Sequence, residues 1–310
     1  MRISRRNVLA KGGAATLAGL TMPAGLTLSA AEDAQPAWTI GDFRITPLLD
    51  GVVEVDETIF TDADPAARRD LLEDAGQPEG KIRLDVNTFL IERGDTTILV
   101  DTGTRDLYGP TLGKLPAALA AAGVDPSDIQ HVILTHMHND HVGGLVDGNG
   151  KSAFANAQLH VAEAEWTYWT SEDNFASATA AGQFSFAGAR AATPLYQDRV
   201  QPFSGTAEIL PGIHPIALPG HSLAHTGFRL TSGADQLIIW GDVVVSPELQ
   251  FAHPEWTSTF DADPAQAAQS RMQIFREVAA DQIPVLGMHL PFPGAGTVLR
   301  NGDAYELTAL

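Results

Sequence analysis

The stretch ILTHMHNDHVGG, residues 133–144, decides how the rest of the chain is interpreted. It places His136, His138, Asp140 and His141 within six residues, directly after a short apolar run. Alternate residues at the end of a strand point the same way, so His136 and His138 can face one point together. Asp140 and His141 follow in the turn and can face a neighbouring point. Imidazole and carboxylate suit Zn²⁺, Mn²⁺, Fe²⁺ or Co²⁺, so the stretch indicates a metal site rather than a solvated histidine-rich loop.

One such cluster seldom completes a metal site, and three further candidate ligands occur later in the chain. They are His221 in LPGHSLAHTG, Asp242 in IIWGDVV and His289 in LGMHLPFPG. Each lies at or just after an apolar run that is typical of a strand, so each can be delivered to one edge of a sheet. Gly143 and Gly144 would let the backbone turn tightly and start a helix close to the ions.

Composition limits the classes of protein to which the chain can belong. It has 310 residues, of which 44% are hydrophobic and 18% charged, so it can build a sizeable core without disulfides. Its formal net charge of -19 repels nucleic-acid phosphates and anionic membranes, which argues against a nuclease. The chain has no cysteine, so any metal must be held by His, Asp or Glu.

Residues 1–31 resemble a twin-arginine export signal. Arg5 and Arg6 precede the weakly apolar stretch AATLAGLTMPAGLTLSAA, which ends in a small-residue cleavage site before Glu32. A disordered basic N-terminus is the alternative. The stretch is too weakly apolar for a transmembrane helix, which needs about 20 strongly apolar residues. The sequence therefore predicts a periplasmic or secreted protein with no membrane span.

No linker rich in Pro, Gly or Ser divides residues 32–310, so we expect a single domain. Residues 38–55 and 83–103 each have the pattern of two strands joined by a tight turn. Residues 263–283 are the clearest amphipathic helix, with Asp263 as its N-cap. Strands therefore alternate with helices along this domain.

The order of these motifs resembles the metallo-β-lactamase superfamily. The signature of that family, His-x-His-x-Asp-His, is followed by a PGH histidine, a GD aspartate and a late histidine, and all of these occur here over roughly residues 38–300. The resemblance implies an α/β fold, a four-layer αββα sandwich. It also implies two divalent metal ions. Zinc is the first choice for a histidine-rich site, and Mn, Fe and Co stay open.

The resemblance further implies a role for each ligand. The first metal would be held by His136, His138 and His221, and the second by Asp140, His141 and His289. Asp242 would bridge the two ions. A hydroxide shared by the ions would be the nucleophile, and Asp140 could accept its hydrogen bond and later pass a proton to the leaving group.

Two more residues are expected beside the metals without binding them. Asp101 in LVDTG would orient a ligand imidazole, and a turn cap is the open alternative. His225, four residues after His221, is expected to stabilise its loop rather than to bind metal.

Within the family, HLPFPGAG and THMHNDHVGGL resemble the branch that contains methyl parathion hydrolase and its lactonase or arylesterase relatives. This resemblance implies hydrolysis of small-molecule lactones or aryl esters, with phosphotriesters such as methyl parathion as a further activity. Relatives of this branch are often dimers, which leaves a homodimer open. A metallo-β-lactamase without a Cys ligand and a catalytically inert metal-binding protein are the alternatives.

Aromatic side chains near the predicted metals are candidates for contact with an aryl or apolar group of the substrate. They are Trp166, Trp169, Phe184, Phe186 and Phe292. For any one of them, packing in the core is the open alternative. The segment 171–190 is rich in Ala, Ser and Gly, and we expect a mobile lid or insertion there rather than core.

Overall fold

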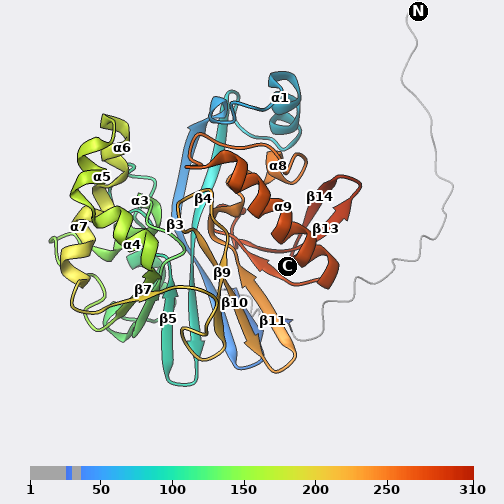
Figure 1. Ribbon diagram of the computed structural model, residues 1–310. Helices are drawn as coiled ribbons and strands as arrows, with labels where there is room; N and C mark the ends of the chain where they lie inside the picture. The colour runs from blue at the N-terminus through green and yellow to red at the C-terminus, as the bar shows by residue number, and fades with distance from the viewer. Residues whose placement is uncertain (1–25, 30–35) are drawn as a thin grey trace, which may run out of the picture.

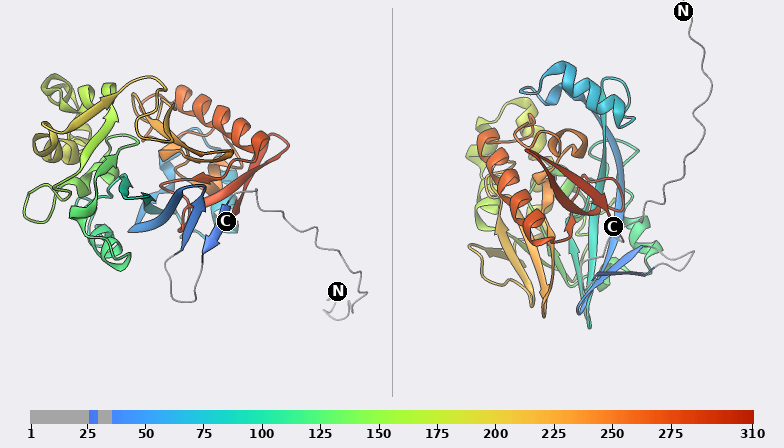
Figure 2. Two further views of the ribbon diagram at one scale, coloured as in Figure 1. Left: turned by 90° about the horizontal axis from the view of Figure 1, so that it is seen from below. Right: turned by 90° about the vertical axis from the view of Figure 1, so that its right-hand side faces the viewer.

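The computed structural model describes residues 26–29 and 36–310 and arranges them as two facing β-sheets with helices on both outer sides (Figures 1 and 2). This is the predicted four-layer αββα sandwich, which is confirmed. Most of the segment predicted as an export signal lies outside the described residues. Its described part, residues 26–29, is a short strand at the edge of the first sheet.

The first sheet has eight strands in sequence order, antiparallel up to its fifth strand and parallel after it. The strands are β1 (Leu26–Ser29), β2 (Ala37–Ile40), β3 (Phe43–Asp56), β4 (Lys81–Arg93), β5 (Thr96–Val100), β6 (His131–Ile133), β7 (Gln158–Ala162) and β8 (Val200–Phe203). The predicted strand pairs over 38–55 and 83–103 are therefore confirmed as β2–β3 and β4–β5.

The second sheet has six strands in the order β14-β13-β12-β11-β10-β9, and only β11 and β12 pair in parallel. The strands are β9 (Ile213–Ala217), β10 (Thr226–Ser232), β11 (Asp235–Ile239), β12 (Val285–Leu286), β13 (Ala295–Asn301) and β14 (Ala304–Ala309). The short strands β6 of the first sheet and β11 and β12 of the second end at the same edge of the sandwich. The predicted metal ligands follow these strand ends.

The helices fall on the two outer faces and at the top of the long strands β3 and β4 in Figure 1. They are α1 (Pro65–Asp74), α2 (Leu115–Ala121), α3 (Asn139–Val142), α4 (Glu163–Thr170), α5 (Glu172–Ser177), α6 (Ala180–Ser185), α7 (Ala187–Tyr196), α8 (Pro247–Gln250) and α9 (Pro264–Asp281). None of the helices among the described residues is long and apolar enough to cross a membrane.

Helix α9 begins where the sequence predicts it. The side chain of Asp263 accepts a hydrogen bond from the Gln266 N–H, and Pro264 occupies the first turn, where its missing N–H costs nothing. Ile274, Phe275 and Val278 of this helix then pack on the outer face of the second sheet. This packing fixes α9 against the second sheet, whose strands β11 and β12 precede Asp242 and His289.

A separate apolar core lies between the two sheets and joins residues of both, such as Phe89 and Ile98 of the first sheet with Phe228 and Ile239 of the second. Burying side chains of this size stabilises the sandwich by about 1.5–3 kcal/mol each, before the cost of ordering the chain. The two sheets are thus held face to face, and their strand ends keep a fixed separation.

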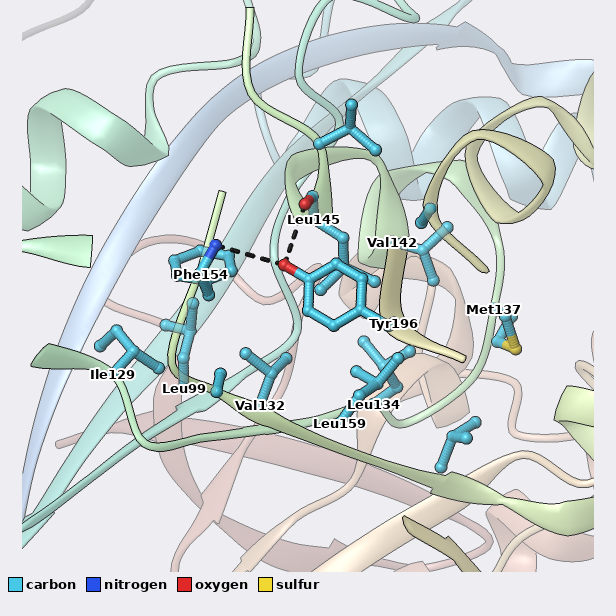
Figure 3. Close-up of a cluster of buried hydrophobic side chains, with 14 of the residues drawn as sticks. Leu99, Ile129, Val132, Leu134, Met137, Val142, Leu145, Phe154, Leu159 and Tyr196 are labelled. Carbon is cyan, nitrogen blue, oxygen red and sulfur yellow. Dashed lines mark hydrogen bonds between the residues drawn. The ribbon is translucent and has the colours of Figure 1, made fainter. Parts of the chain in front are cut away.

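The helices α4 and α7 close the outer face of the first sheet over a third core (Figure 3). Tyr196 of α7 lies in this cluster, where its hydroxyl accepts a hydrogen bond from the Phe154 N–H and donates one to the Leu145 carbonyl. Phe186 and Ala189 are also buried in it. The expectation that 171–190 is not core is therefore wrong for its C-terminal part, because the start of α7 packs against Val142 and Asn139 of α3.

Candidate metal centre

The predicted histidine cluster lies at the C-terminal end of β6 and in the short helix α3 that follows. His136 and His141 are buried, and the backbone of this segment is joined to the loop after β5. The Thr102 N–H donates to the His141 carbonyl over 2.8 Å. A Cβ on Gly144 would lie 1.9 Å from the Thr102 carbonyl oxygen, so only glycine allows this close approach.

Three imidazoles form the first ligand group, as the resemblance implies. Nδ1 of His138 lies 3.0 Å from Nε2 of His136 and 3.0 Å from Nε2 of His221. His136 and His138 come from the end of β6, whereas His221 comes from the loop between β9 and β10. These three side chains could hold one metal ion.

The second ligand group combines two carboxylates with two imidazoles. Oδ2 of Asp140 lies 3.5 Å from Nε2 of His141 and 3.4 Å from Nε2 of His289. Asp242 completes this group, because its Oδ2 lies 3.2 Å from Nε2 of His141 and 3.0 Å from Nε2 of His289.

Asp242 also reaches the first group. Its Oδ2 lies 3.4 Å from Nε2 of His221 and 3.8 Å from Nε2 of His136. One carboxylate oxygen therefore lies between the two sets of donors, in the position that a bridging ligand needs.

Hydrogen bonds to the outer ring nitrogens fix the orientation of three ligands. Nδ1–H of His141 donates to Asp101 over 2.7 Å, and Nδ1–H of His221 donates to Asp261 over 2.9 Å. Nδ1–H of His289 donates to the Asp85 carbonyl over 2.8 Å. Each bond turns the Nε2 atom inward and fixes the tautomer, which is the usual function of such partners in metal sites.

Of these partners the sequence indicates Asp101 but not Asp261. Asp101 directly follows β5, and it also accepts hydrogen bonds from the N–H and hydroxyl of Thr135. Asp261 lies in the loop between α8 and α9, forty residues after its histidine. No spacing rule connects the two, because the contact exists only once the second sheet has folded.

His225 lies beside the centre with both ring nitrogens occupied by protein groups. Its Nδ1–H donates to the Leu218 carbonyl over 3.0 Å, and its Nε2 accepts from the Asp242 N–H over 2.9 Å. It thereby joins the loop before β10 to the loop that carries Asp242, which is the loop-stabilising position that we expect.

The charges of the centre attract cations to the second group. Burial opposes protonation of His141, yet Asp242, Asp140 and Asp101 outweigh it and raise the pKa of His141 well above its usual value. Likewise, burial is outweighed at His289, where Asp242 raises the pKa to about 10. In the first group, burial and the neighbouring His221 lower the pKa of His138 to about 3. Without metal, the second group therefore holds protons.

These donors fit two divalent ions. In the first group, Nδ1–H of His221 already donates to Asp261, so its Nε2 presents a lone pair toward the other two rings. In the second group, Oδ1 of Asp242 is buried and, among the described residues, has no hydrogen-bond partner. Converging lone pairs and an unpartnered carboxylate oxygen are costly without a cation. Histidine and carboxylate are also the donors that zinc accepts.

The centre forms the floor of a cavity of about 350 Å³. Its wall is mostly apolar and comes largely from the long extensions of β3 and β4 and from the α6 segment. The apolar lining residues are Val53, Val55, Leu84, Val86, Tyr108, Leu112, Phe184 and Phe260. Among the described residues that line it, none is Lys or Arg.

The five aromatics predicted to contact substrate are all described, and they separate into three sets. Phe184 lines the cavity above the metal ligands. Trp169 and Phe186 instead line a second cavity of about 390 Å³ that also touches His138. Trp166 packs on the core of the first sheet, and Phe292 is 37% exposed. Neither of these last two lines either cavity.

Sequence reasoning missed Tyr108 and Phe260. The two residues lie in irregular segments far from any ligand motif. Tyr108 stacks edge-to-face on Phe184 at 5.6 Å, so loop 101–114 and the α6 segment meet above the centre. Only the folding of these loops brings the two aromatics to the cavity.

Comparison with known proteins agrees with this architecture. The family model of the metallo-beta-lactamase superfamily matches residues 82–285. An N-acyl homoserine lactonase from Bacillus cereus is 22% identical over 228 residues, which cover 67% of this chain and 82% of the relative. The lactonase AiiB from Agrobacterium fabrum is 36% identical over 89 residues. That match covers 23% of this chain and spans only 32% of the length of AiiB.

Solved structures share nearly the whole fold. The hydrolase AbOPH in the beta lactamase superfamily aligns with a TM-score of 0.83 at 27% identity, covering 94% of this chain and 99% of its own. AidC, a dizinc quorum-quenching lactonase, aligns with a TM-score of 0.81 at 23% identity, covering 92% and 97%. Together with the match of the family model over most of the chain, these findings show that the chain belongs to the metallo-beta-lactamase superfamily and has its fold.

Proposed function

We propose that this protein is a dinuclear metal-dependent hydrolase that cleaves lactones or aryl esters of small, neutral molecules. The observation that carries the proposal is the convergence of seven histidine and aspartate side chains, in two groups, at the floor of an apolar cavity. The relatives that are lactonases support the same reaction class.

The metals would be held by His136, His138 and His221 in one group and by Asp140, His141, Asp242 and His289 in the other. When bound, two such ions supply Lewis-acid activation of water and of a substrate oxygen. We propose zinc, which suits these donors and which the name of AidC reports for that protein.

Asp140 is suited to move the proton in this reaction. Its side chain is 20% exposed and lines the cavity, whereas that of Asp242 is only 3% exposed. In the metal-free protein, burial alone would raise the pKa of Asp140, but His141 and His289 keep it well below its usual range. Because Asp140 lines the cavity, its carboxylate can accept a proton there and donate it to the leaving oxygen of the substrate.

The cavity wall favours neutral substrates over anions. A β-lactam carries a carboxylate that would need a basic partner, and the described lining residues include no Lys or Arg. An ester or lactone has no such need, and its apolar group can pack against Phe184, Tyr108 and Phe260. This difference ranks the β-lactamase alternative below the esterase proposal.

We also propose that the protein belongs to the methyl parathion hydrolase branch and turns over phosphotriesters as a further activity. The phosphoryl centre of a phosphotriester has the tetrahedral shape of the intermediate in ester hydrolysis. The same donors and the same apolar wall could therefore serve both reactions.

A substrate panel tests these proposals on protein whose metal content has been measured. It contains dihydrocoumarin, an acyl-homoserine lactone, a p-nitrophenyl ester, methyl paraoxon and nitrocefin. We expect turnover of the lactone or the ester, lost on chelation and in His136→Ala. Turnover of nitrocefin alone would mean a β-lactamase, and a metal-loaded protein inactive on the whole panel would mean an inert metal binder.

We further propose export through the twin-arginine signal over residues 1–31 and assembly as a homodimer. A reporter fused after residue 31 should reach the periplasm, and replacing Arg5 and Arg6 by Lys should retain it inside the cell. Light scattering of the purified protein tests the dimer. A monomer at micromolar concentration would contradict it.

A further inference from the structure

A buried carboxylate outside both ligand groups joins the segments that carry the first of them. Glu165 lies in α4 and is 0% exposed. Its Oε2 accepts hydrogen bonds from the Met137 N–H over 3.2 Å and from the Trp169 indole N–H over 2.8 Å. Its Oε1 accepts from the Ser222 hydroxyl over 2.6 Å and from the Ala224 N–H over 2.8 Å.

Two of the donors to Glu165 are sequence neighbours of ligands in the first group. Met137 lies between the ligands His136 and His138, and Ser222 directly follows the ligand His221. The first of these segments belongs to the end of β6 in the first sheet, and the second to the loop between β9 and β10 of the other sheet. One side chain thus binds both segments without contacting a metal ligand through any of these four bonds.

Glu165 reaches His138 by a second route. The indole of Trp169 packs edge-to-face on the His138 ring with centroids 5.5 Å apart. The N–H of the same indole donates to Glu165, so the carboxylate fixes the position of the indole and, through it, that of the His138 ring. The His138 imidazole is therefore held through the backbone of the preceding residue, Met137, and through its aromatic neighbour Trp169.

We propose that Glu165 is a positioning residue that sets the geometry of the first ligand group and therefore its metal affinity. The proposal rests on the metal centre described above, and it concerns the first group only. In the second group, His141 and His289 are oriented by Asp101 and by the Asp85 carbonyl instead. Partners that orient metal ligands typically contribute about 10–100-fold to affinity.

The Glu165→Gln variant tests this role, because an amide keeps the shape of the side chain but can accept hydrogen bonds at only one of its two ends. At least one segment would then lose its bond. Zinc affinity is measured by chelator competition in two backgrounds. His289→Ala disables the second group and reports on the first, whereas His136→Ala disables the first and reports on the second.

Asp50→Asn is the matched control. Asp50 is also 0% exposed and also accepts four hydrogen bonds, from the Thr104 N–H and hydroxyl and from the N–H groups of Gly113 and Leu115. It therefore measures the general cost of placing an amide in a buried carboxylate site. None of its donors lies in a segment of the first ligand group.

In the His289→Ala background we expect Glu165→Gln to weaken zinc binding by about 10–100-fold, with Asp50→Asn unchanged within about twofold. In the His136→Ala background Glu165→Gln should leave affinity unchanged within about twofold. Equal losses in Glu165→Gln and Asp50→Asn, or no loss in either, would overturn the proposal. The hydrolase proposal is judged separately, on the panel and the metal content of the unmodified protein.

Ser222→Ala covers the case in which Glu165→Gln does not fold. It removes one donor from the His221 side and leaves the carboxylate in place. In the His289→Ala background we expect zinc affinity to fall by about 3–10-fold, which is less than the ~10–100-fold effect of a lost orienting partner, because the other three hydrogen bonds to Glu165 remain. A folded Ser222→Ala variant with unchanged zinc affinity would contradict the positioning role.

Discussion

Asp242 is the residue at which the two ligand groups meet, because its Oδ2 lies near a ring nitrogen of each. Asp242→Asn keeps the shape of the side chain but removes its charge. We expect fewer than two metal equivalents per chain and a rate at least about 100-fold lower, since the loss of an orienting partner alone costs about 10–100-fold. Elemental analysis and ester hydrolysis measure both effects. Full metal content in this variant would count against the bridging role.

Phe184 and Phe292 form a matched pair of exposed phenylalanines, 46% and 37% exposed, of which only Phe184 lines the cavity above the centre. Phe184→Ala should raise KM for an aryl ester about 3–10-fold, from the loss of one aromatic contact. Phe292→Ala should leave KM unchanged, and both variants should keep their metal. A larger effect on KM from Phe292→Ala would move the substrate site away from this cavity.

His160 makes the fold sensitive to acid at a site away from the metal ligands. Burial, together with His131 at 3.0 Å, lowers the pKa of His160 to about 4. An unfolded histidine titrates near 6.5, so between pH 6.5 and about 4 the unfolded chain binds a proton that the folded chain does not. Stability is therefore full above pH 6.5 and falls by up to about 1.4 kcal/mol for each pH unit below it.

Denaturant unfolding of metal-free protein at pH 7 and pH 5 checks this expectation. The unmodified chain should lose more stability between the two values than His160→Gln, which has no proton to gain. The metal ligands titrate equally in both proteins, so the difference reports on His160 together with its neighbour His131. Equal losses of stability in the two proteins would mean that His160 is already protonated in the folded state at pH 5, which would contradict the expectation.

At the scale of elements, the sequence predicts those features that depend on contacts within one stretch of the chain. The hairpin β4–β5 and the cap of α9 at Asp263 follow from alternation and capping within one stretch of sequence. The ligands at the ends of β6 and β11 follow from the same rule, since a short buried strand is succeeded by polar residues. Asp261, Glu165 and Tyr108 could not be predicted in this way. The partners that tie them to the centre or its cavity lie tens of residues away in other segments, and a sequence pattern within one segment does not predict such contacts.

The turn from β6 into α3 depends on close packing against the loop after β5. A Cβ on Gly144 would clash with the Thr102 carbonyl at 1.9 Å, whereas a Cβ on Gly148 meets nothing within 4 Å. We expect Gly144→Ala to lower the free energy of unfolding by about 1–3 kcal/mol through overpacking, and to weaken metal binding because His141 moves with the loop. Gly148→Ala should change neither quantity. Thermal unfolding and zinc titration of the two variants give the comparison.

At the scale of the whole molecule, each ligand group takes donors from both sheets. His138 follows β6 of the first sheet, and His221 precedes β10 of the second. In the other group, His141 lies in α3, while Asp242 follows β11. Each ion would therefore join the two sheets at one edge, in addition to the apolar core between them.

Chelation should consequently loosen that edge and leave the opposite one intact. An ion present at 100 times its Kd stabilises the folded state by about 2.7 kcal/mol, so its removal should lower Tm by about 5–10 °C. Hydrogen exchange should accelerate at residues 135–142, 219–226 and 240–244, which carry ligands from both sheets. It should not change around Gly233, where the hairpin between β10 and β11 turns at the far end of both strands. Uniform acceleration across the chain would instead mean that the metals stabilise the fold as a whole rather than the edge at which the sheets meet.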